Sequence, residues 1–318
     1  MKVVFTGLLV LLALTRGWAQ GDYFKFTDYN MAQPIINPAA IGQDLGVAGV
    51  LLYQSCFEAT EFRPTTGAFN INSAIKDKGL GGGISLIYDK FGPYEKVTAY
   101  VQGSYRLKVN EGKYLYFGLQ VGLNYVTNDP SKYKIKDEEP MLMQQIKLSQ
   151  PNVGFGLHYT AEKYYVGISL PELMYNYVDR EGEKQSGMIA DKLRLFVYGG
   201  FKFDLSQNVK LEPYSYITYS ESDNMEVDLG ARLWYKDLFN FGVQYRTKES
   251  ASVMARVRLL DELWLGYAYE NNSESASDFN KRQEIGITFR FGKKGTKKSE
   301  NQSKDDPYEE NINSIRYF

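Results

Sequence analysis

Histidine and cysteine are nearly absent from this sequence, which holds one of each, His158 and Cys56, in 318 residues. With a single histidine, set in an alternating apolar run, the chain has no conventional histidine zinc site and no usual Ser-His arrangement. We therefore interpret His158 as structural. A single cysteine cannot form an internal disulfide bond, so the fold must be stable without one.

An excess of charge and long apolar runs are also missing. The 37 Lys and Arg residues balance 38 Asp and Glu residues, giving a formal net charge of -1, which offers no electrostatic basis for binding nucleic acid. After residue 19, polar residues interrupt every apolar run. We therefore expect no transmembrane helix there.

Motifs that carry chemistry are absent as well. The glycine-rich run GLGGG at 79–83 precedes a strand-like segment rather than a helix, so it is not a phosphate-binding loop. The acidic group at 137–139 lies among lysines and lacks the regular oxygen-ligand spacing of a calcium site. We expect no enzyme, no catalytic residues, no cofactor and no metal site.

The first residues have the pattern of a secretion signal. Lys2 precedes an apolar run at 3–14 and a small-x-small cleavage pattern at 17–19. The run is too short to span a bilayer. We expect a signal peptide at 1–19 and a mature protein that begins at Gln20; the alternative is a buried N-terminal helix of similar composition.

Strict alternation of apolar and polar residues dominates the rest of the chain and indicates β-strands. In residues 239–246 the odd-numbered side chains are apolar and the even-numbered ones are Asn, Gly, Gln and Arg. One face of such a strand suits hydrocarbon and the other suits water. Strands of about ten residues match a tilted membrane strand. A soluble β-sandwich would alternate in the same way, so periodicity alone leaves both architectures open.

The lengths of the connections favour a membrane barrel. We predict about fourteen strands, an even number that places both termini in the periplasm. They start near Gly46, Pro64, Leu80, Tyr94, Gly112, Pro151, Lys163, Asp191, Asn208, Met225, Leu238, Ser250, Glu262 and Lys281. Connections after even-numbered strands are tight, whereas the long ones, 128–150, 174–190 and 271–280, follow odd-numbered strands, as in outer-membrane barrels. The predicted fold is all-β, a transmembrane antiparallel barrel at 46–291 in the outer membrane of a Gram-negative bacterium.

Charged side chains on the polar strand faces are expected to face the lumen, because two arginines on one face are costly in a packed core. These candidates are Arg106, Arg246, Arg256, Arg258, Arg290 and Glu284. Aromatic residues within or near strand ends are expected either at the membrane interface or in the ordinary role of strand formers. They are Tyr114, Tyr116, Tyr164, Tyr165, Tyr198, Tyr214, Tyr216, Trp234, Tyr235, Trp264, Tyr267 and Tyr269.

The alternation stops after Phe291. Segment 292–318 is rich in charge and poor in apolar residues, which predicts a flexible periplasmic tail. It ends in Ile315, Arg316, Tyr317 and Phe318, which we interpret either as a docking peptide or as a disordered remnant. A further interpretation is that residues 289–291, or the terminal phenylalanine, are recognised by the machinery that assembles barrels.

Several stretches, taken in order along the chain, carry a family resemblance. They are QPIINPAAIG before the first strand, LGGGISLIYDKFG, YLYFGLQVGLNY, YYVGISLPEL, FDLSQNVKLEPYSYITY, FNFGVQYRTKESASVMARVRLLDELWLGYAYE and the terminal RYF. Together they resemble the PorP/SprF family of type IX secretion system membrane proteins. The resemblance implies an outer-membrane β-barrel of Bacteroidota that works in protein secretion and, in some members, in gliding motility.

The same resemblance implies partners. Members of the family are associated with the periplasmic ring of PorK and PorN, with the peptidoglycan-binding protein PorE, and with secreted cargo held at the cell surface. Outer-membrane lipid would surround the barrel, and no nucleic acid is expected.

The stretch QPIINPAAIG at 33–42 lies in an N-terminal segment, 20–45, that we predict to plug the periplasmic mouth of the barrel. It lacks the aromatic residue of the family motif N-P-A-Y/F-A-G. Asn-Pro fixes a turn, the prolines stiffen the chain and small alanines permit close packing. The candidate residues, for this packing or for binding a partner, are Gln33, Pro34, Asn37, Pro38 and Gly42.

Two functions remain open from the sequence. The first is a non-enzymatic component that anchors or couples the secretion machinery through its periplasmic face and tail and retains surface cargo through its long loops. The alternative is an outer-membrane channel or hydrophobic-solute transporter, because barrels of about fourteen strands can enclose a ligand-sized lumen. An enzyme on a β scaffold would lack a nucleophile, a base and a metal set.

Overall fold

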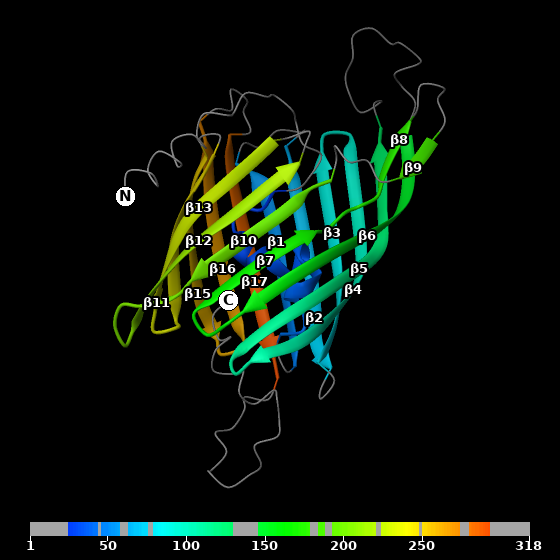
Figure 1. Ribbon diagram of the computed structural model, residues 1–318. Helices are drawn as coiled ribbons and strands as arrows, with labels where there is room; N and C mark the ends of the chain where they lie inside the picture. Colours follow the sequence, from blue (N-terminus) through cyan, green and yellow to red (C-terminus); the bar gives the residue numbers. More distant parts are fainter. Residues whose placement is uncertain are drawn as a thin grey trace, which may run out of the picture.

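The alternating segments pair with their neighbours in sequence order and close into an antiparallel barrel of 14 strands (Figure 1). The structure, a computed structural model, describes residues 25–43, 46–57, 63–75, 79–129, 146–178, 184–187, 193–220, 224–247, 250–273 and 280–292. The predicted signal peptide, the long acidic connection and the tail with Ile315, Arg316, Tyr317 and Phe318 lie outside the described residues.

Every strand of the wall is bonded on both sides. The strands are β1 (Val47–Cys56), β2 (Thr65–Ile75), β3 (Leu80–Phe91), β4 (Tyr94–Asn110), β5 (Lys113–Asn128), β6 (Ile146–Thr160), β7 (Tyr164–Leu170), β10 (Leu195–Phe201) continued by β11 (Phe203–Asp204), β12 (Val209–Ser220), β13 (Asn224–Tyr235), β14 (Phe239–Arg246), β15 (Ser250–Leu260), β16 (Leu263–Asn272) and β17 (Lys281–Phe291). The hairpin of β8 (Tyr175–Val178) and β9 (Lys184–Gly187) is separate from the wall. Pairing of β1 with β17, from Val47 with Phe291 to Cys56 with Arg282, closes the ring. Because the ring is closed, no edge strand of the wall is exposed with unpaired backbone groups in the hydrocarbon.

The predicted strand starts are confirmed to within a single residue, except at two strands. β6 begins at Ile146 rather than at Pro151, and β10 begins at Leu195 rather than at Asp191. The connections are sorted as expected. The long ones, 128–146, 170–195 and 272–281, lie at one end of the barrel, called here the long-loop end; the opposite end, with 110–113, 160–164 and 260–263, is the short-turn end.

The alternation of faces is confirmed in β14, where exposed and buried side chains strictly alternate. Phe241 and Tyr245 are about half exposed on the outer, lipid-facing side, whereas Asn240 and Gln244 are buried inside. Isolated apolar side chains of this kind cover the outer surface of membrane barrels. None of the helices in the described residues is long and apolar enough to cross a membrane.

The prediction of an aromatic belt at the membrane interface is wrong for many of the residues proposed. Tyr164 and Tyr267 do lie on the outer face. The rings that are instead buried are Tyr114, Tyr116, Tyr165, Tyr198, Tyr214, Tyr216 and Trp234. Their position in the alternation puts them on the inner face, because successive strand residues point to opposite sides. They line the lumen and pack against what fills it.

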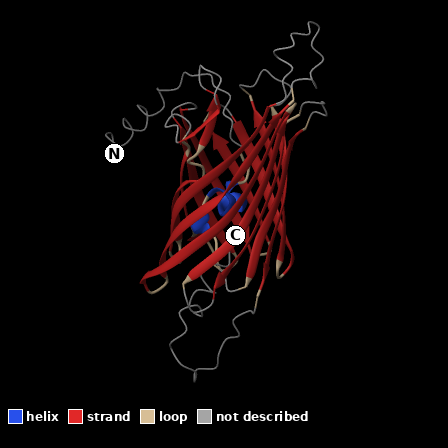
Figure 2. Ribbon diagram, turned by 90° about the vertical axis from the view of Figure 1, so that its right-hand side faces the viewer, coloured by secondary structure: helices blue, strands red, loops and turns tan. Residues whose placement is uncertain are grey.

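An N-terminal segment, residues 25–43, fills the interior. Its helix α2 (Tyr29–Ile36) and 3-10 turn η1 (Pro38–Ala40) lie inside the barrel (Figure 2). Asn37 is extended and ends α2, and its side-chain Oδ1 accepts a hydrogen bond of 2.8 Å from the Ala39 amide to cap η1. Asparagine as a cap and proline at the first helical position are the residues this geometry favours. The Asn-Pro turn predicted from the sequence is therefore present.

The segment lies deeper than at the periplasmic mouth where we predicted it. Lys25 is near the long-loop end, because it pairs with Glu226 at the start of β13. Gly46 packs against the end of β17 at the short-turn end. The segment thus runs through the lumen from one end to the other. The described chain begins at Lys25 near one end and finishes at Gly292 beyond the other; both termini lie outside the described residues.

Gly118 on β5 tests how tightly the segment is seated. A Cβ atom at this position would overlap the backbone of Pro38 and Ala39, whereas one at Gly103 on the neighbouring strand β4 would meet nothing within 4 Å. Overpacking costs about 1–3 kcal/mol. We expect Gly118→Ala to lower the free energy of unfolding by this amount and Gly103→Ala to leave it nearly unchanged, in thermal unfolding followed by circular dichroism in detergent. Equal stability of the two variants would contradict a tightly seated η1.

Candidate functional site in the barrel lumen

The N-terminal segment is bonded around the whole circumference of the lumen. Hydrogen bonds or ion pairs join it to twelve strands of the wall, which are β1, β2, β4, β6, β7, β10 and β12 to β17. At β3 and β5 glycines allow direct backbone contact, of Gly81 with Gly42 and of Gly118 with η1. Contacts on all sides hold the segment in one position.

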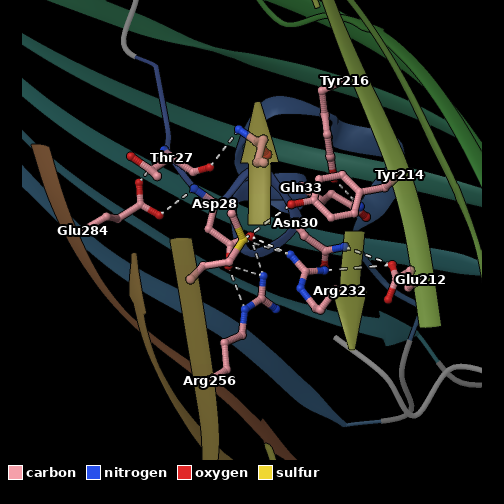
Figure 3. Close-up of polar contacts among 12 residues, drawn as sticks. Thr27, Asp28, Asn30, Gln33, Glu212, Tyr214, Tyr216, Arg232, Arg256 and Glu284 are labelled. Carbon is pink, nitrogen blue, oxygen red and sulfur yellow. Dashed lines mark hydrogen bonds and ion pairs between the residues drawn. The ribbon is translucent and has the colours of Figure 1, made fainter. Parts of the chain in front are cut away.

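Asp28, which precedes α2, lies between two arginines of the wall (Figure 3). Its carboxylate accepts hydrogen bonds from Arg256 Nε at 2.8 Å and from Arg232 Nη2 at 3.1 Å. Arg232 also faces Glu212, with 3.9 Å between Nη1 and Oε1. Buried charges require such paired, hydrogen-bonded partners. Asp28 is the group that joins β13 and β15 across the inside of the barrel.

Glu284 of β17 binds the backbone just before α2 (Figure 3). Its two carboxylate oxygens accept hydrogen bonds from the amides of Thr27 at 2.8 Å and Asp28 at 3.1 Å. The side chain of Asp28 makes no cap, since it faces the arginines. Glu284 therefore holds the two backbone amides that come directly before the short helix.

Arg246, at the long-loop end of β14, joins the start of the segment to two acidic side chains. Its Nη2 donates to the Phe26 carbonyl at 2.9 Å, its Nε to Asp228 Oδ1 at 2.6 Å and its Nη1 to Glu270 Oε1 at 3.1 Å. Glu270 in turn accepts from the Thr27 hydroxyl at 3.1 Å. A planar guanidinium suits such multiple recognition.

Polar and aromatic contacts continue along α2. Gln33 Nε2 donates to the Tyr216 hydroxyl at 2.8 Å, and the Tyr29 ring stacks on Tyr216 with centroids 5.2 Å apart. Asn37 Nδ2 donates to the Leu157 carbonyl and to the Tyr198 hydroxyl, each at 3.0 Å. These contacts account for two of the buried tyrosines of the inner wall, Tyr198 and Tyr216.

A second inward segment, residues 171–174, follows β7 and enters the lumen from the long-loop end. Glu172 is buried and accepts hydrogen bonds from Lys96 Nζ, each at 3.0 Å. Gln120 Nε2 donates to the Pro171 carbonyl at 2.8 Å. Asn152 Oδ1 accepts from the amides that follow Glu172. The lumen therefore holds two segments of the chain, residues 25–43 and 171–174.

The structure brings several of the predicted residues together. Arg246, Arg256 and Glu284 are buried in the lumen and contact the N-terminal segment. Arg106 is buried elsewhere, with its guanidinium carbon 5.1 Å from the centroid of the Tyr114 ring. Arg258, over the Trp264 ring, and Arg290 are only partly buried, near the short-turn end.

The proposed plug residues and His158 also lie inside the barrel. The five plug candidates are Gln33, Pro34, Asn37, Pro38 and Gly42; Pro34 is partly buried and the other four are buried. Their contacts favour packing over the direct binding of an outside partner. His158 is buried, with Nδ1 3.1 Å from the Tyr198 hydroxyl.

Sequence reasoning missed the acidic partners of the lumen arginines and one arginine. These are Asp28, Glu212, Glu226, Asp228, Glu270 and Arg232. For the acids on strands, the signal was their place on the inner face of the alternation. For Asp28 the signal was only indirect, because several inward arginines require a carboxylate from somewhere in the chain.

Comparison with known families decides what kind of barrel this is. Residues 19–291 match the family described as "Type IX secretion system membrane protein PorP/SprF". The chain belongs to the PorP/SprF family. It is therefore an outer-membrane barrel of a secretion-system family, as the sequence resemblance indicated. No curated protein matches the sequence.

Solved barrels share the architecture of this PorP/SprF member at low sequence identity. The monoaromatic hydrocarbon channel CymD is 13% identical, with a TM-score of 0.51 over 86% of this chain and 95% of that one. Omp33 of Acinetobacter baumannii is 8% identical, with a TM-score of 0.46 over 79% and 100% of the two chains. A FadL homologue of Pseudomonas aeruginosa is 11% identical, with a TM-score of 0.44 over 80% and 93%. CymD supports the fold alone.

Asp28 provides a test of what holds the segment. Removing one member of a buried ion pair costs about 3–5 kcal/mol. We expect Asp28→Asn to lower the free energy of unfolding by this amount at pH 7, measured by thermal unfolding in detergent. The control is Asp204→Asn, whose carboxylate makes an exposed pair with Lys163.

Equal stability of Asp28→Asn and Asp204→Asn would contradict the role of Asp28 in holding the segment.

Proposed function

We propose that this protein is a non-enzymatic outer-membrane component of the type IX secretion system that anchors or couples the periplasmic machinery and retains secreted cargo at the cell surface. Membership of the PorP/SprF family supports the system. The observation that carries the proposal is the filled lumen, in which segments 25–43 and 171–174 occupy the interior that a solute would cross. An occupied interior suits a scaffold better than a channel.

The loops support an orientation of the barrel. Barrels of the outer membrane have short periplasmic turns, which supports a periplasmic position for the short-turn end. Exposed residues there, such as Glu111 in the turn between β4 and β5, face the compartment of the proposed PorK and PorN ring and of a PorE-like protein. The long-loop end faces the proposed surface cargo. The host is, in this proposal, a member of the Bacteroidota, in which the system serves secretion and can serve gliding motility.

Conductance separates this function from a diffusion channel. We expect the purified protein to give no large, stable open-channel current in planar bilayers, because the segment at 25–43 blocks the lumen. Deleting residues 26–42 should raise the current, with heat-modifiable migration in gels as the control for a folded barrel. A large current from the wild-type protein would contradict the scaffold and favour the hydrophobic-solute channel.

Crosslinking tests the coupling itself. A photoreactive residue at Glu111, on the short-turn end, should crosslink to periplasmic secretion proteins in whole envelopes, identified by mass spectrometry. The matched control is Lys147, exposed on β6 near the long-loop end, which should give no periplasmic partner. The same experiment with a chain that ends at Gly292 tests the tail, whose loss should reduce the crosslinks. Absence of periplasmic partners in both chains would overturn the coupling role.

A further inference from the structure

The first described residues lie at the long-loop end of the lumen. Lys25 Nζ is 2.7 Å from Glu226 Oε2, and Glu226 is close to the first residue of β13 at that end. The Phe26 carbonyl accepts a hydrogen bond of 2.9 Å from Arg246, the last residue of β14 and also at that end. The neighbouring strands β13 and β14 therefore both hold the beginning of the segment at the long-loop end.

The last residues of the segment lie at the opposite, short-turn end. The Gly42 amide donates to Asn72 Oδ1 at 3.0 Å, and the Gly42 backbone touches Gly81, near the first residue of β3. Gly46 has a φ of 118° and packs against Phe291 and Gly292, where β17 ends. A side chain at Gly46 would overlap the Phe291 carbonyl. The chain is therefore tightly packed where it reaches the pairing of β1 with β17.

The chain before Lys25 cannot return through the barrel. Asp22 is three residues away, and three residues span at most about 11 Å when fully extended. The apolar band of an outer-membrane barrel is about 25 Å tall. The lumen between the two ends is already occupied by the segment itself.

We propose that the chain on the amino-terminal side of Lys25 opens at the cell surface, whereas Gly292 leaves the barrel on the periplasmic face. The chain would then leave the barrel at the cell surface before Lys25 and in the periplasm after Gly292, with the buried segment 25–43 as the link between the surface exit and strand β1. The surface end is anchored through Thr27 and Asp28 to four inner-wall side chains: Glu270, Glu284, Arg232 and Arg256. This inference depends on barrel orientation and not on the proposed coupling function.

Single-cysteine labelling of intact cells tests the proposal. The substitutions are Asp22→Cys and, as a second position, Lys25→Cys. Lys147→Cys reports the long-loop end and Glu111→Cys reports the short-turn end, and both are exposed on the barrel. The unchanged chain gives the background, since its Cys56 is buried. A membrane-impermeant maleimide is applied before and after lysis, and retention of each variant in the outer membrane is checked.

We expect Asp22→Cys to be labelled on intact cells to the same extent as Lys147→Cys, while Glu111→Cys is labelled only after lysis. Labelling of Asp22→Cys and Lys25→Cys only after lysis, with Lys147→Cys labelled on intact cells, would overturn the proposal. Labelling of Glu111→Cys rather than Lys147→Cys on intact cells would mean a reversed barrel and would overturn it as well. Neither result bears on whether periplasmic proteins crosslink to the short-turn end.

Discussion

Inside a closed barrel, every charge that leaves bulk water has to find its partner within the protein. The inner wall carries Arg232 and Arg256 close together, and the carboxylate that they share comes from Asp28, far away in the sequence. Without it, the Arg256 guanidinium would lose the carboxylate that it binds, and Arg232 would be left with the more distant Glu212. The wall and the segment therefore depend on each other. The arginines of the wall bind the carboxylate of the segment, and a glutamate of the wall binds the backbone amides of the segment.

This mutual dependence also explains the unusual aromatic composition. Part of the tyrosine content lines the lumen, where rings stack on the helix and hydroxyl groups bind its polar side chains, as Tyr216 does with Tyr29 and Gln33. A tyrosine can pack like a hydrocarbon and still donate or accept a hydrogen bond. Such a lining suits a lumen that is filled with folded chain rather than with water. It is consistent with a scaffold built around a fixed centre.

Much of the wall was predictable from the sequence because strand alternation in a membrane barrel is imposed by two different solvents. The start of β6 was missed because Pro151 looked like a strand boundary. β6 pairs with β7 only from Phe155 onward, and the Val153 carbonyl, which points to the β7 side, binds Leu173 instead. Pro151 points the same way, so its missing amide interrupts no strand pairing. The ion pairs of the lumen were not predictable, because their members are distant in the sequence and only the fold brings them together.

The segment that fills the lumen also depends on closure of the barrel. The segment contacts nearly every strand, so its full set of contacts exists only when the strands surround it. The seam that closes the ring is that of β1 with β17. Since β1 follows the segment directly, the pairing that joins the two ends of the barrel sequence begins next to the segment that the barrel encloses.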